Sequence, residues 1–538
     1  MTRDLDQLIG RTFDVLVVGG GIYGLTIACD AADRGLSVAL IERADFGSGA
    51  SFNHSRTIHG GLRYLQTFDV GRSRESVRER RTLARIAPHA VRPLPFALPL
   101  YRSVLKGKLA MRAGFFLDRV IGFDRNRAVP SDLRLPRGRV VSRSEAIERF
   151  PGLRRRGLTG AAVWHDYVTL EADRLTFSWA IAASERGATL ANYVEATAPL
   201  VSDRRVGGVQ AVDRRTGREL EIAAKLTIDA SGGGFERQLS TLGSFTPAPR
   251  LKAMNLVTRR DAGDEALGGK STAGRYLFLV PNHNRAIFGT WESSRACAPE
   301  DGAPVATEIE SFIGELNQAF PSLDLKPADV TLVHRGVVPA TVKSNGAVAL
   351  DGHERVRDFS RSGVEGLVGV TGAKYTTARA TAERVTDLAC RKLQQSAAPC
   401  RTFVTPLPGG DLGDVVSAIG SARREHDARL PSDTIPHLIA GYGSRYPQIL
   451  ELANQQSKWR TRVADDSPVI GAQLVWAVRN EMALTLADAI IRRTPIGAMG
   501  YPGDVAAQRA ADLVGEELNW TSQRKQEEIE TVRAFYRL

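Results

Sequence analysis

Over the first forty residues, the hydrophobic positions follow the spacing of a strand, then that of a helix, then that of a strand again. Residues 13–18 form a β-branched run of strand length, and small apolar residues between positions 25 and 32 then recur at helical spacing. Gly35 follows the helical stretch as a stop signal, and a second apolar run over residues 37–41 ends in Glu42. The pattern predicts a strand, a helix and a second strand, which is the opening of an α/β domain.

A glycine-rich turn joins the first strand to the helix. Residues 19–24 fit the spacing G-x-G-x-x-G. In this spacing Gly19 permits the tight turn, Gly21 leaves room for a pyrophosphate, and Gly24 lets the helix pack closely on the strand. Glu42 is placed to accept hydrogen bonds from an adenosine ribose, and its charge would repel the 2′-phosphate of NADP. The unit predicts a dinucleotide site and leaves FAD and NAD as alternatives.

The rest of the chain divides into a strand-rich part and a helical part. Residues 277–281 and 286–290 read as neighbouring strands of an antiparallel sheet. From about residue 405 onward the apolar spacing becomes helical. A chain of 538 residues is long enough for two or three domains.

Composition excludes several classes of protein. The four cysteines form no C-x-x-C or metal-ligand spacing, which indicates a reducing compartment and no structural metal. The first apolar run is short and ends in glycines, so we expect neither a signal peptide nor a membrane span, and a cytoplasmic protein. The net charge of +12 comes from scattered basic residues, which argues against nucleic acid. An anionic substrate, an anionic membrane surface and solubility all remain compatible with it.

Longer strings along the chain carry a family resemblance. Residues 58–65 read IHGGLRYL, residues 226–232 read LTIDASG and residues 369–377 read GVTGAKYTT. Residues 164–166 (WHD) and 407–410 (LPGG) add shorter matches. With these strings the chain resembles the FAD-dependent glycerol-3-phosphate dehydrogenase family, within the D-amino-acid-oxidase-like flavoproteins, over nearly its whole length.

The resemblance implies an α/β fold with three parts and FAD as the cofactor. A discontinuous Rossmann-type FAD-binding domain is expected over residues 12–80, 155–242 and 345–395. An α+β substrate cap domain is expected over residues 81–154 and 243–344. Residues 405–538 are expected to form a C-terminal helical domain.

The resemblance also implies the residues of the site. We expect the cofactor to be bound by residues at the carboxyl ends of the strands and in the loops between them: Gly19, Gly21, Gly24, Glu42, Ser51, His59, Gly60, Gly61, Ser231, Gly232, Gly372, Lys374 and Thr376. We expect the substrate to be bound by Arg63, Tyr64, Arg335 and Lys374, with His334 and Lys343 as further candidate anion contacts.

Three of these side chains are candidate catalytic residues. His59 is the first candidate for the base that takes the hydroxyl proton, because an imidazole titrates near working pH. Lys374 would stabilise the negative charge of the reduced flavin, and Arg63 would orient the substrate. No metal is expected to take part.

The implied reaction is oxidation of the secondary hydroxyl of a polyol phosphate, such as glycerol 3-phosphate to dihydroxyacetone phosphate. A hydride would pass to flavin N5, and the electrons would pass on to quinone or another acceptor. The alternatives are a flavin oxidase of a hydroxy or amino acid that uses oxygen, and a catalytically inactive flavin-binding partner protein.

The sequence departs from the family on the substrate side. Val338 stands where the family has an arginine that binds the substrate phosphate, and a second expected arginine is missing near residues 348–351. The family's Thr-Thr-Asp after a glycine is replaced by residues 290–292, Thr-Trp-Glu. The small anionic substrate implied by the resemblance can therefore differ from glycerol 3-phosphate.

Residues 101–123 mix arginine and lysine with leucine and phenylalanine. They predict a basic amphipathic helix that either lies peripherally on the inner face of the plasma membrane, near quinone, or packs on the cap domain.

Overall fold

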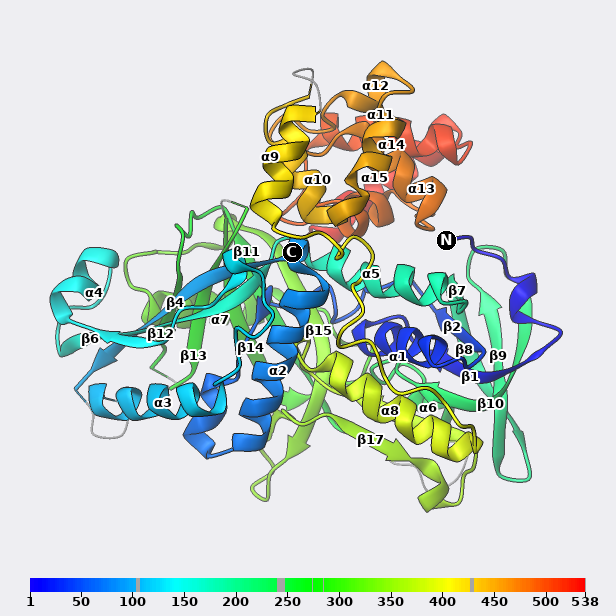
Figure 1. Cartoon of the computed structure of the whole chain (residues 1–538), viewed down its shortest axis with the longest axis horizontal. Helices are drawn as coiled ribbons and strands as arrows, with labels where there is room; N and C mark the ends of the chain where they lie inside the picture. Colours follow the sequence, from blue (N-terminus) through cyan, green and yellow to red (C-terminus); the bar gives the residue numbers. More distant parts are fainter. Residues whose placement is uncertain (103–106, 240–246, 273, 284, 426–429, 538) are drawn as a thin grey trace.

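The computed structural model describes residues 1–102, 107–239, 247–272, 274–283, 285–425 and 430–537. Two sheets lie side by side in the lower part of the molecule, and a group of helices from the last quarter of the chain sits above them (Figure 1). The chain is an α/β protein with a Rossmann-type sheet, a second sheet that covers one of its ends, and a C-terminal helical domain.

The first sheet has the parallel centre that an apolar run predicts. Its central order is β17-β18-β10-β1-β2-β7, and β1 pairs in parallel with both β2 and β10. Buried on both faces, β1 is apolar over most of its length. The described strands of this sheet are β1 (Thr12–Val18), β2 (Val38–Glu42), β7 (Thr189–Asn192), β8 (Val194–Ser202), β9 (Arg205–Asp213), β10 (Glu219–Asp229), β17 (Arg355–Asp358) and β18 (Leu367–Thr371).

The second sheet is mostly antiparallel and runs in the order β16-β15-β11-β14-β13-β12-β4-β6-β3, with β5 paired to β6. One face packs on helix α7 (Ala306–Ala319) through a cluster that includes Phe288 and Phe312. Its described strands are β3 (Thr57–Ile58), β4 (Val91–Tyr101), β5 (Arg139–Val141), β6 (Leu158–Thr169), β11 (Arg250–Thr258), β12 (Ala266–Lys270), β13 (Tyr276–Asn282), β14 (Arg285–Ala296), β15 (Val330–Val342) and β16 (Val348–Leu350).

The helical domain packs on both sheets. Its core continues into the second sheet, because Ile490 belongs to the same buried cluster as Leu332 of β15. The described helices of this domain are α9 (Val415–Glu425), α10 (Thr434–Tyr442), α11 (Tyr446–Ala453), α12 (Ser457–Arg460), α13 (Gly471–Asn480), α14 (Asp504–Glu517) and α15 (Ser522–Phe535).

Buried ion pairs join the helical domain to the first sheet. Arg493 donates from Nη1 and Nη2 to the two carboxylate oxygens of Asp45, at 2.7 and 2.8 Å, and both side chains are fully buried. Arg174 donates to Glu481 at 2.5 Å in a second buried pair. Removing one partner of such a pair leaves a buried charge without compensation, so these contacts fix how the domains sit.

The remaining helices cover the two sheets: α1 (Ile22–Asp33), α2 (Val70–Ile86), α3 (Lys108–Ile121), α4 (Arg143–Arg149), α5 (Ala172–Glu185), α6 (Glu236–Leu239) and α8 (Ala378–Leu393). The strands expected over 277–281 and 286–290 are β13 and β14, so that prediction is confirmed.

Sheet membership differs in places from the three expected segments. Residues 155–169 were assigned to the cofactor domain, but β6 pairs along its length with β4 and so belongs to the second sheet. Strand β3 also pairs with β6. The part of the expected boundary near residues 240–246 lies outside the described residues. The division into domains therefore stays a proposal, with β3 and β6 moved to the cap.

Candidate active site

A cavity of about 1040 Å³ runs between the two sheets. It begins at the carboxyl ends of β1, β2 and β10 and extends to β13, β14, β15 and β16 of the second sheet. Most of the residues expected in the site line it: Gly19, Gly21, Glu42, Ser51, His59, Gly61, Arg63, Tyr64, Ser231, Gly232, Gly372, Lys374 and Thr376.

The glycine turn holds its shape through two close contacts. A β-carbon on Gly24 would lie 1.9 Å from the carbonyl oxygen of Gly19, so only glycine allows α1 to cross the turn at this distance. Gly19 itself has φ +110° and lies against Ala230 of the neighbouring strand end. Gly24 does not line the cavity, and its contact is the packing role that the motif predicts.

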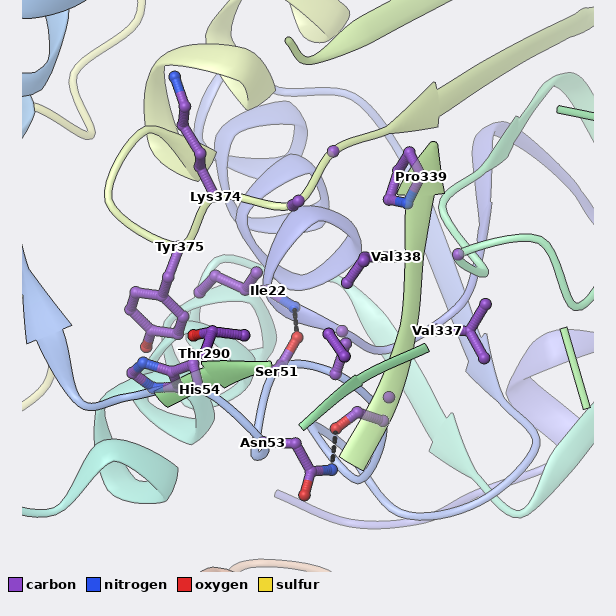
Figure 2. A pocket seen from close by; sticks show the side chains of 18 of the residues that line it. Ile22, Ser51, Asn53, His54, Thr290, Val337, Val338, Pro339, Lys374 and Tyr375 are labelled. Atoms are coloured by element: carbon purple, nitrogen blue, oxygen red, sulfur yellow. Dashed lines mark hydrogen bonds between the residues drawn. The ribbon is translucent and has the colours of Figure 1, made fainter. Parts of the chain in front are cut away.

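The amino end of α1 points into this cavity. Its first N–H group, that of Ile22, donates to Ser51 Oγ at 2.9 Å (Figure 2). Gly21 lines the cavity beside them, where a β-carbon would lie 3.1 Å from Ser51 Oγ. A helix amino terminus with free space before it attracts phosphate oxygens, which fits the pyrophosphate of a dinucleotide.

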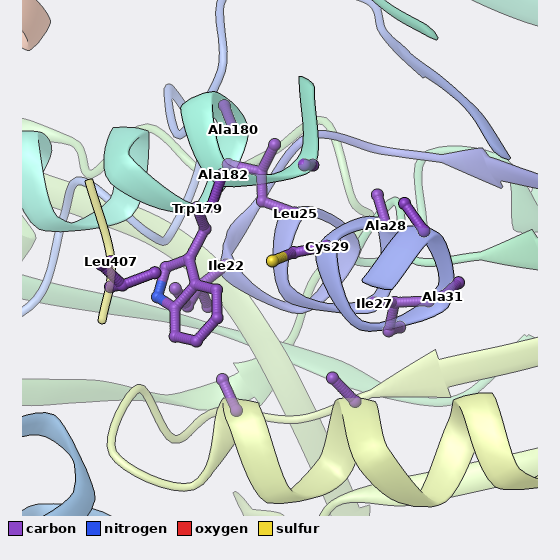
Figure 3. Close-up of a cluster of buried hydrophobic side chains, with 14 of the residues drawn as sticks. Ile22, Leu25, Ile27, Ala28, Cys29, Ala31, Trp179, Ala180, Ala182 and Leu407 are labelled. Carbon is purple, nitrogen blue, oxygen red and sulfur yellow. The ribbon is translucent and has the colours of Figure 1, made fainter. Parts of the chain in front are cut away.

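Helix α1 packs between helices α5 and α8. Figure 3 shows Leu25 and Cys29 of α1 on the side of Trp179 and Ala180 of α5, with α8 on the other side of α1. Trp179 is 2% exposed and is among the largest fully buried side chains. This packing positions the amino end of the helix at the cavity.

Glu42 lies at one end of the cavity and is held by the backbone. Its carboxylate accepts hydrogen bonds from the N–H groups of Gly20 at 2.7 Å and Ala44 at 2.9 Å. Burial raises the pKa of this carboxyl, and the two backbone N–H groups oppose that rise. The acid is thus fixed beside the glycine turn, and its contact with an adenosine ribose stays a prediction from the sequence.

Lys374 lies at the other end of the cavity. Its ammonium nitrogen is 4.0 Å from Glu354 Oε1 and 4.4 Å from the centre of the Tyr64 ring. Nζ is buried, and within the described residues no protein group accepts a hydrogen bond from it. Burial lowers the pKa of Lys374 to about 8, although Glu354 opposes the shift.

The structure changes the expected protonation of His59. Burial, together with the charges of Arg63 and Lys374, lowers its pKa to about 3. The expectation that this imidazole titrates near working pH is therefore wrong, because an imidazolium ion would be desolvated among cations. At physiological pH the ring is neutral. Its backbone N–H donates to Thr376 Oγ1 at 3.3 Å.

Gly60 lies behind the cavity wall and does not line it, contrary to the expectation for the cofactor site. Its N–H donates to Asp166 Oδ1 at 2.7 Å, and a β-carbon would lie 2.3 Å from the guanidinium of Arg80. Asp166 also accepts from Trp164 Nε1 at 2.9 Å and pairs with Arg80. This buried carboxylate therefore holds the loop that carries His59.

Arg335 was expected to bind substrate, but it does not line the cavity. Its backbone N–H donates to Asn53 Oδ1 at 3.0 Å, and its guanidinium lies 5.4 Å from the ring centre of Phe535 in α15. His334 is fully buried outside the cavity lining, and Lys343 is exposed beyond the end of β15.

Val338 and residues 348–350 do line the cavity, at the positions where arginines were expected. Figure 2 shows Val338 leaving β15 on the side where Ile22 lies. This wall is apolar, so it supplies no charge for a phosphate. Among the described residues no group of three or more histidine, cysteine or acidic side chains could hold a metal ion.

Several lining residues escaped the sequence analysis. His54 stacks on Tyr375, with ring centres 4.5 Å apart and planes inclined by 14°. Arg275 lines the cavity from the position just before β13, and Thr290, named in the sequence only as a departure from the family, lines it from β14. His54 lies within the matched region and could have been suspected, whereas nothing local marks Arg275.

A cavity with a helix amino terminus and a fixed acid at one end and a buried amine at the other defines a dinucleotide-dependent oxidoreductase. Residues 14–388 match the family model described as FAD dependent oxidoreductase, and residues 400–525 match the C-terminal domain of alpha-glycerophosphate oxidase. The chain belongs to the FAD-dependent glycerol-3-phosphate dehydrogenase family, and its cofactor is FAD.

Relatives from distant organisms match nearly the whole chain. Glycerol-3-phosphate dehydrogenase of Synechocystis sp. is 30% identical, over 99% of this chain and 98% of its own. The mitochondrial enzyme of Mus musculus is 32% identical, over 97% of this chain and 73% of its own. The structure of glycerol-3-phosphate dehydrogenase from Bacillus halodurans complexed with FAD has a TM-score of 0.76 at 23% identity, covering 98% of this chain and 95% of that one.

Replacing Gly24 by alanine should remove FAD from the protein. The new β-carbon would lie 1.9 Å from the Gly19 carbonyl, so the helix must move away from the turn. We expect a severalfold lower flavin content in purified protein, measured by visible absorbance. Gly207→Ala is the matched control, because nothing lies within 4 Å of its β-carbon. Equal flavin content in both variants would contradict this account of the turn.

Proposed function

We propose that this chain is a FAD-dependent dehydrogenase that oxidises the secondary hydroxyl of a polyol phosphate, such as glycerol 3-phosphate, or of a related hydroxy compound. The observation that carries the proposal is the buried amine of Lys374, a residue that lines the cavity, within a chain whose relatives are named glycerol-3-phosphate dehydrogenases. An amine with a pKa of about 8 can take a proton at physiological pH.

Different residues of the chain take different roles in the oxidation of the alcohol. Bound FAD supplies the acceptor for the hydride that leaves the substrate carbon. The neutral amine of Lys374 takes the hydroxyl proton, so that the C–H and O–H bonds break and a C=O bond forms. The ring of His59 stays neutral. It can accept a hydrogen bond from the substrate hydroxyl or donate one to it. The exposed Arg63 and the buried Tyr64 orient the substrate, and the ring of Tyr64 packs against the amine.

This assignment gives Lys374, and not His59, the role of the base that takes the hydroxyl proton. A base with a pKa of about 3 gives little driving force for taking the proton of an alcohol, whereas a base near 8 is matched to working pH. Once it is protonated, Lys374 also places a positive charge beside the cofactor site, which favours the reduced anionic flavin.

The rate of flavin reduction should rise with pH through about 8, because the neutral amine of Lys374 is the active form. Lys374→Met should lower the rate at least a hundredfold and abolish the pH dependence, measured by anaerobic stopped-flow absorbance. His59→Asn should lower the rate less and keep the same apparent pKa. A rate that falls as pH rises through 8 would show that the ammonium, and not the amine, is required.

Anaerobic mixing with glycerol 3-phosphate, other hydroxy compounds and amino acids tests the function itself. Bleaching of the flavin by a hydroxy compound is the expected result. Hydrogen peroxide formation in air would instead favour the oxidase. A flavin that dithionite bleaches but that no hydroxy compound reduces would favour the inactive flavin-binding protein.

Electron transfer to quinone is the second part of the proposal, and an exposed apolar patch on α3 supports it. Leu109 is 79% and Phe116 65% exposed, and basic Arg112 and Arg119 are on the same helix. Phe115 is buried instead, against Gly138. Basic and apolar side chains together suit the headgroup region of an anionic membrane on the inner face of the cell. No described helix is long and apolar enough to cross a bilayer, and residues 103–106 lie outside the described part.

The Leu109→Ser, Phe116→Ser double variant should bind anionic vesicles about tenfold more weakly than the wild type, because two apolar side chains no longer enter the interface. Co-sedimentation with phosphatidylglycerol vesicles measures this. Phe403→Ser, at a 42% exposed phenylalanine outside α3, is the matched control. Equal sedimentation of the wild type and the double variant would rule out α3 as a membrane contact.

A further inference from the structure

A carboxylate that does not line the cavity lies next to the amine of Lys374. Glu354 belongs to the segment just before β17. Its Oε1 atom lies 4.0 Å from Lys374 Nζ, and the two side chains are 6% and 8% exposed. Among the described residues no other carboxylate lies within this distance of the nitrogen. One member of the pair therefore lines the cavity, and the other stands outside it.

Neighbouring elements hold both members of the pair in place. Thr377 Oγ1 donates to Glu354 Oε1 at 2.5 Å. Gly372 leaves room for the acid, because a β-carbon there would lie 3.0 Å from Glu354 Cγ. From α1, the hydroxyl of Tyr23 donates to the backbone oxygen of Lys374 at 2.9 Å. The carboxylate and the backbone that carries the amine are thus fixed relative to each other.

Other charged groups surround the same nitrogen. The guanidinium of Arg72, from α2, lies 4.4 Å from the centre of the Tyr64 ring, which the amine approaches at the same distance. Arg72 and Arg63 disfavour an ammonium ion here, whereas Glu75 favours one. Glu75 already accepts a hydrogen bond from Arg384 at 2.5 Å, and Tyr64 is neutral because burial raises its pKa. The carboxylate 4.0 Å away is therefore the main anionic neighbour of the amine.

The pair changes its charge during the proposed oxidation. Lys374 starts as a neutral amine and becomes an ammonium ion when it takes the hydroxyl proton. Burial lowers the pKa of Lys374, and the charge of Glu354 is the largest effect that opposes this fall. His59 adds no charge, since its ring is neutral. A contact that strengthens as charge develops stabilises the transition state more than the ground state.

We propose that Glu354 is a positioning residue that sets the proton affinity of Lys374, because its carboxylate stabilises the ammonium ion that forms as the amine takes the substrate's hydroxyl proton. The proton moves from the hydroxyl oxygen to Nζ, and Glu354 neither gains nor loses one. This inference rests on the proposed oxidation of a secondary hydroxyl and adds a second residue to its proton transfer. Since Glu354 does not line the cavity, it acts on kcat and not on substrate binding.

The pH profile of Glu354→Gln tests the inference on the FAD-loaded enzyme. Anaerobic flavin reduction should show a midpoint about one pH unit lower than in the wild type, because the neutral amide no longer favours the ammonium ion. The limiting rate at high pH should fall about threefold or more, since the amine is a weaker base. Below about pH 7 the variant should match or exceed the wild type, because more of its amine is neutral. KM should stay unchanged.

Two further variants separate charge from fold. Glu354→Asp keeps the carboxylate one methylene farther away, so its midpoint should lie between those of Glu354→Gln and the wild type. Glu365→Gln, at a side chain 55% exposed in the loop before β18, is the matched control and should leave the profile unchanged. A merely structural role for Glu354 would lower the rate and the flavin content at every pH and leave the midpoint in place.

Trace acetylation measures the same protonation without turnover. Acetic anhydride reacts with the neutral amine, so labelling of Lys374 across a pH series, read by mass spectrometry of its peptide, gives the midpoint directly. We expect a lower midpoint in Glu354→Gln than in the wild type. Equal labelling midpoints in the two proteins would overturn the inference, whatever happens to the rate.

The outcomes also distinguish this inference from the proposed function. If the wild-type rate rises through about pH 8 and Glu354→Gln keeps both the midpoint and the limiting rate, the inference is overturned while the dehydrogenase function stands. If no hydroxy compound reduces a flavin that dithionite bleaches, the proposed function fails, and the role of Glu354 in proton transfer fails with it.

Discussion

The carbonyl oxygen of Gly19 lies where a side chain on residue 24 would begin, and the site depends on this contact. Because residue 24 has no β-carbon, α1 crosses its own turn at a distance that no other residue permits. The helix axis then points its amino end at the carboxyl ends of β1 and β10. Ser51, Glu42 and Ala230 come together around that point, although they belong to different loops and strands. If α1 were displaced by about the width of a methyl group, its amino end would no longer lie among these three residues.

Burial determines the chemistry of the cavity as strongly as the identity of its side chains does. The same low exposure that makes His59 a very weak base brings the amine of Lys374 into the physiological range. Asp166, also buried, pairs with Arg80 and supports the loop that carries His59. His59, Lys374 and Asp166 therefore differ in their proposed roles because their surroundings differ.

Local sequence predicted much of the fold but only part of the site. The opening strand, helix and strand could be predicted because each follows from a run of adjacent residues, as could β13 and β14. Long-range pairing could not be predicted in this way. Strand β6 pairs with β4 across more than fifty intervening residues, so local sequence did not reveal that β6 belongs to the second sheet. Arg335 was assigned to the substrate because a motif gave its position without the direction of its side chain, and Arg275 was missed because no motif surrounds it.

Asp45 and Arg493 are separated by 448 residues, yet they form one of the most buried ion pairs of the protein. During synthesis the amino-terminal segment leaves the ribosome long before its basic partner has been made. Burial of the Asp45 carboxylate without that partner would be costly, so we expect Asp45 to stay hydrated until then. The nascent chain therefore lacks this charge partner of Asp45 until residue 493 has been made.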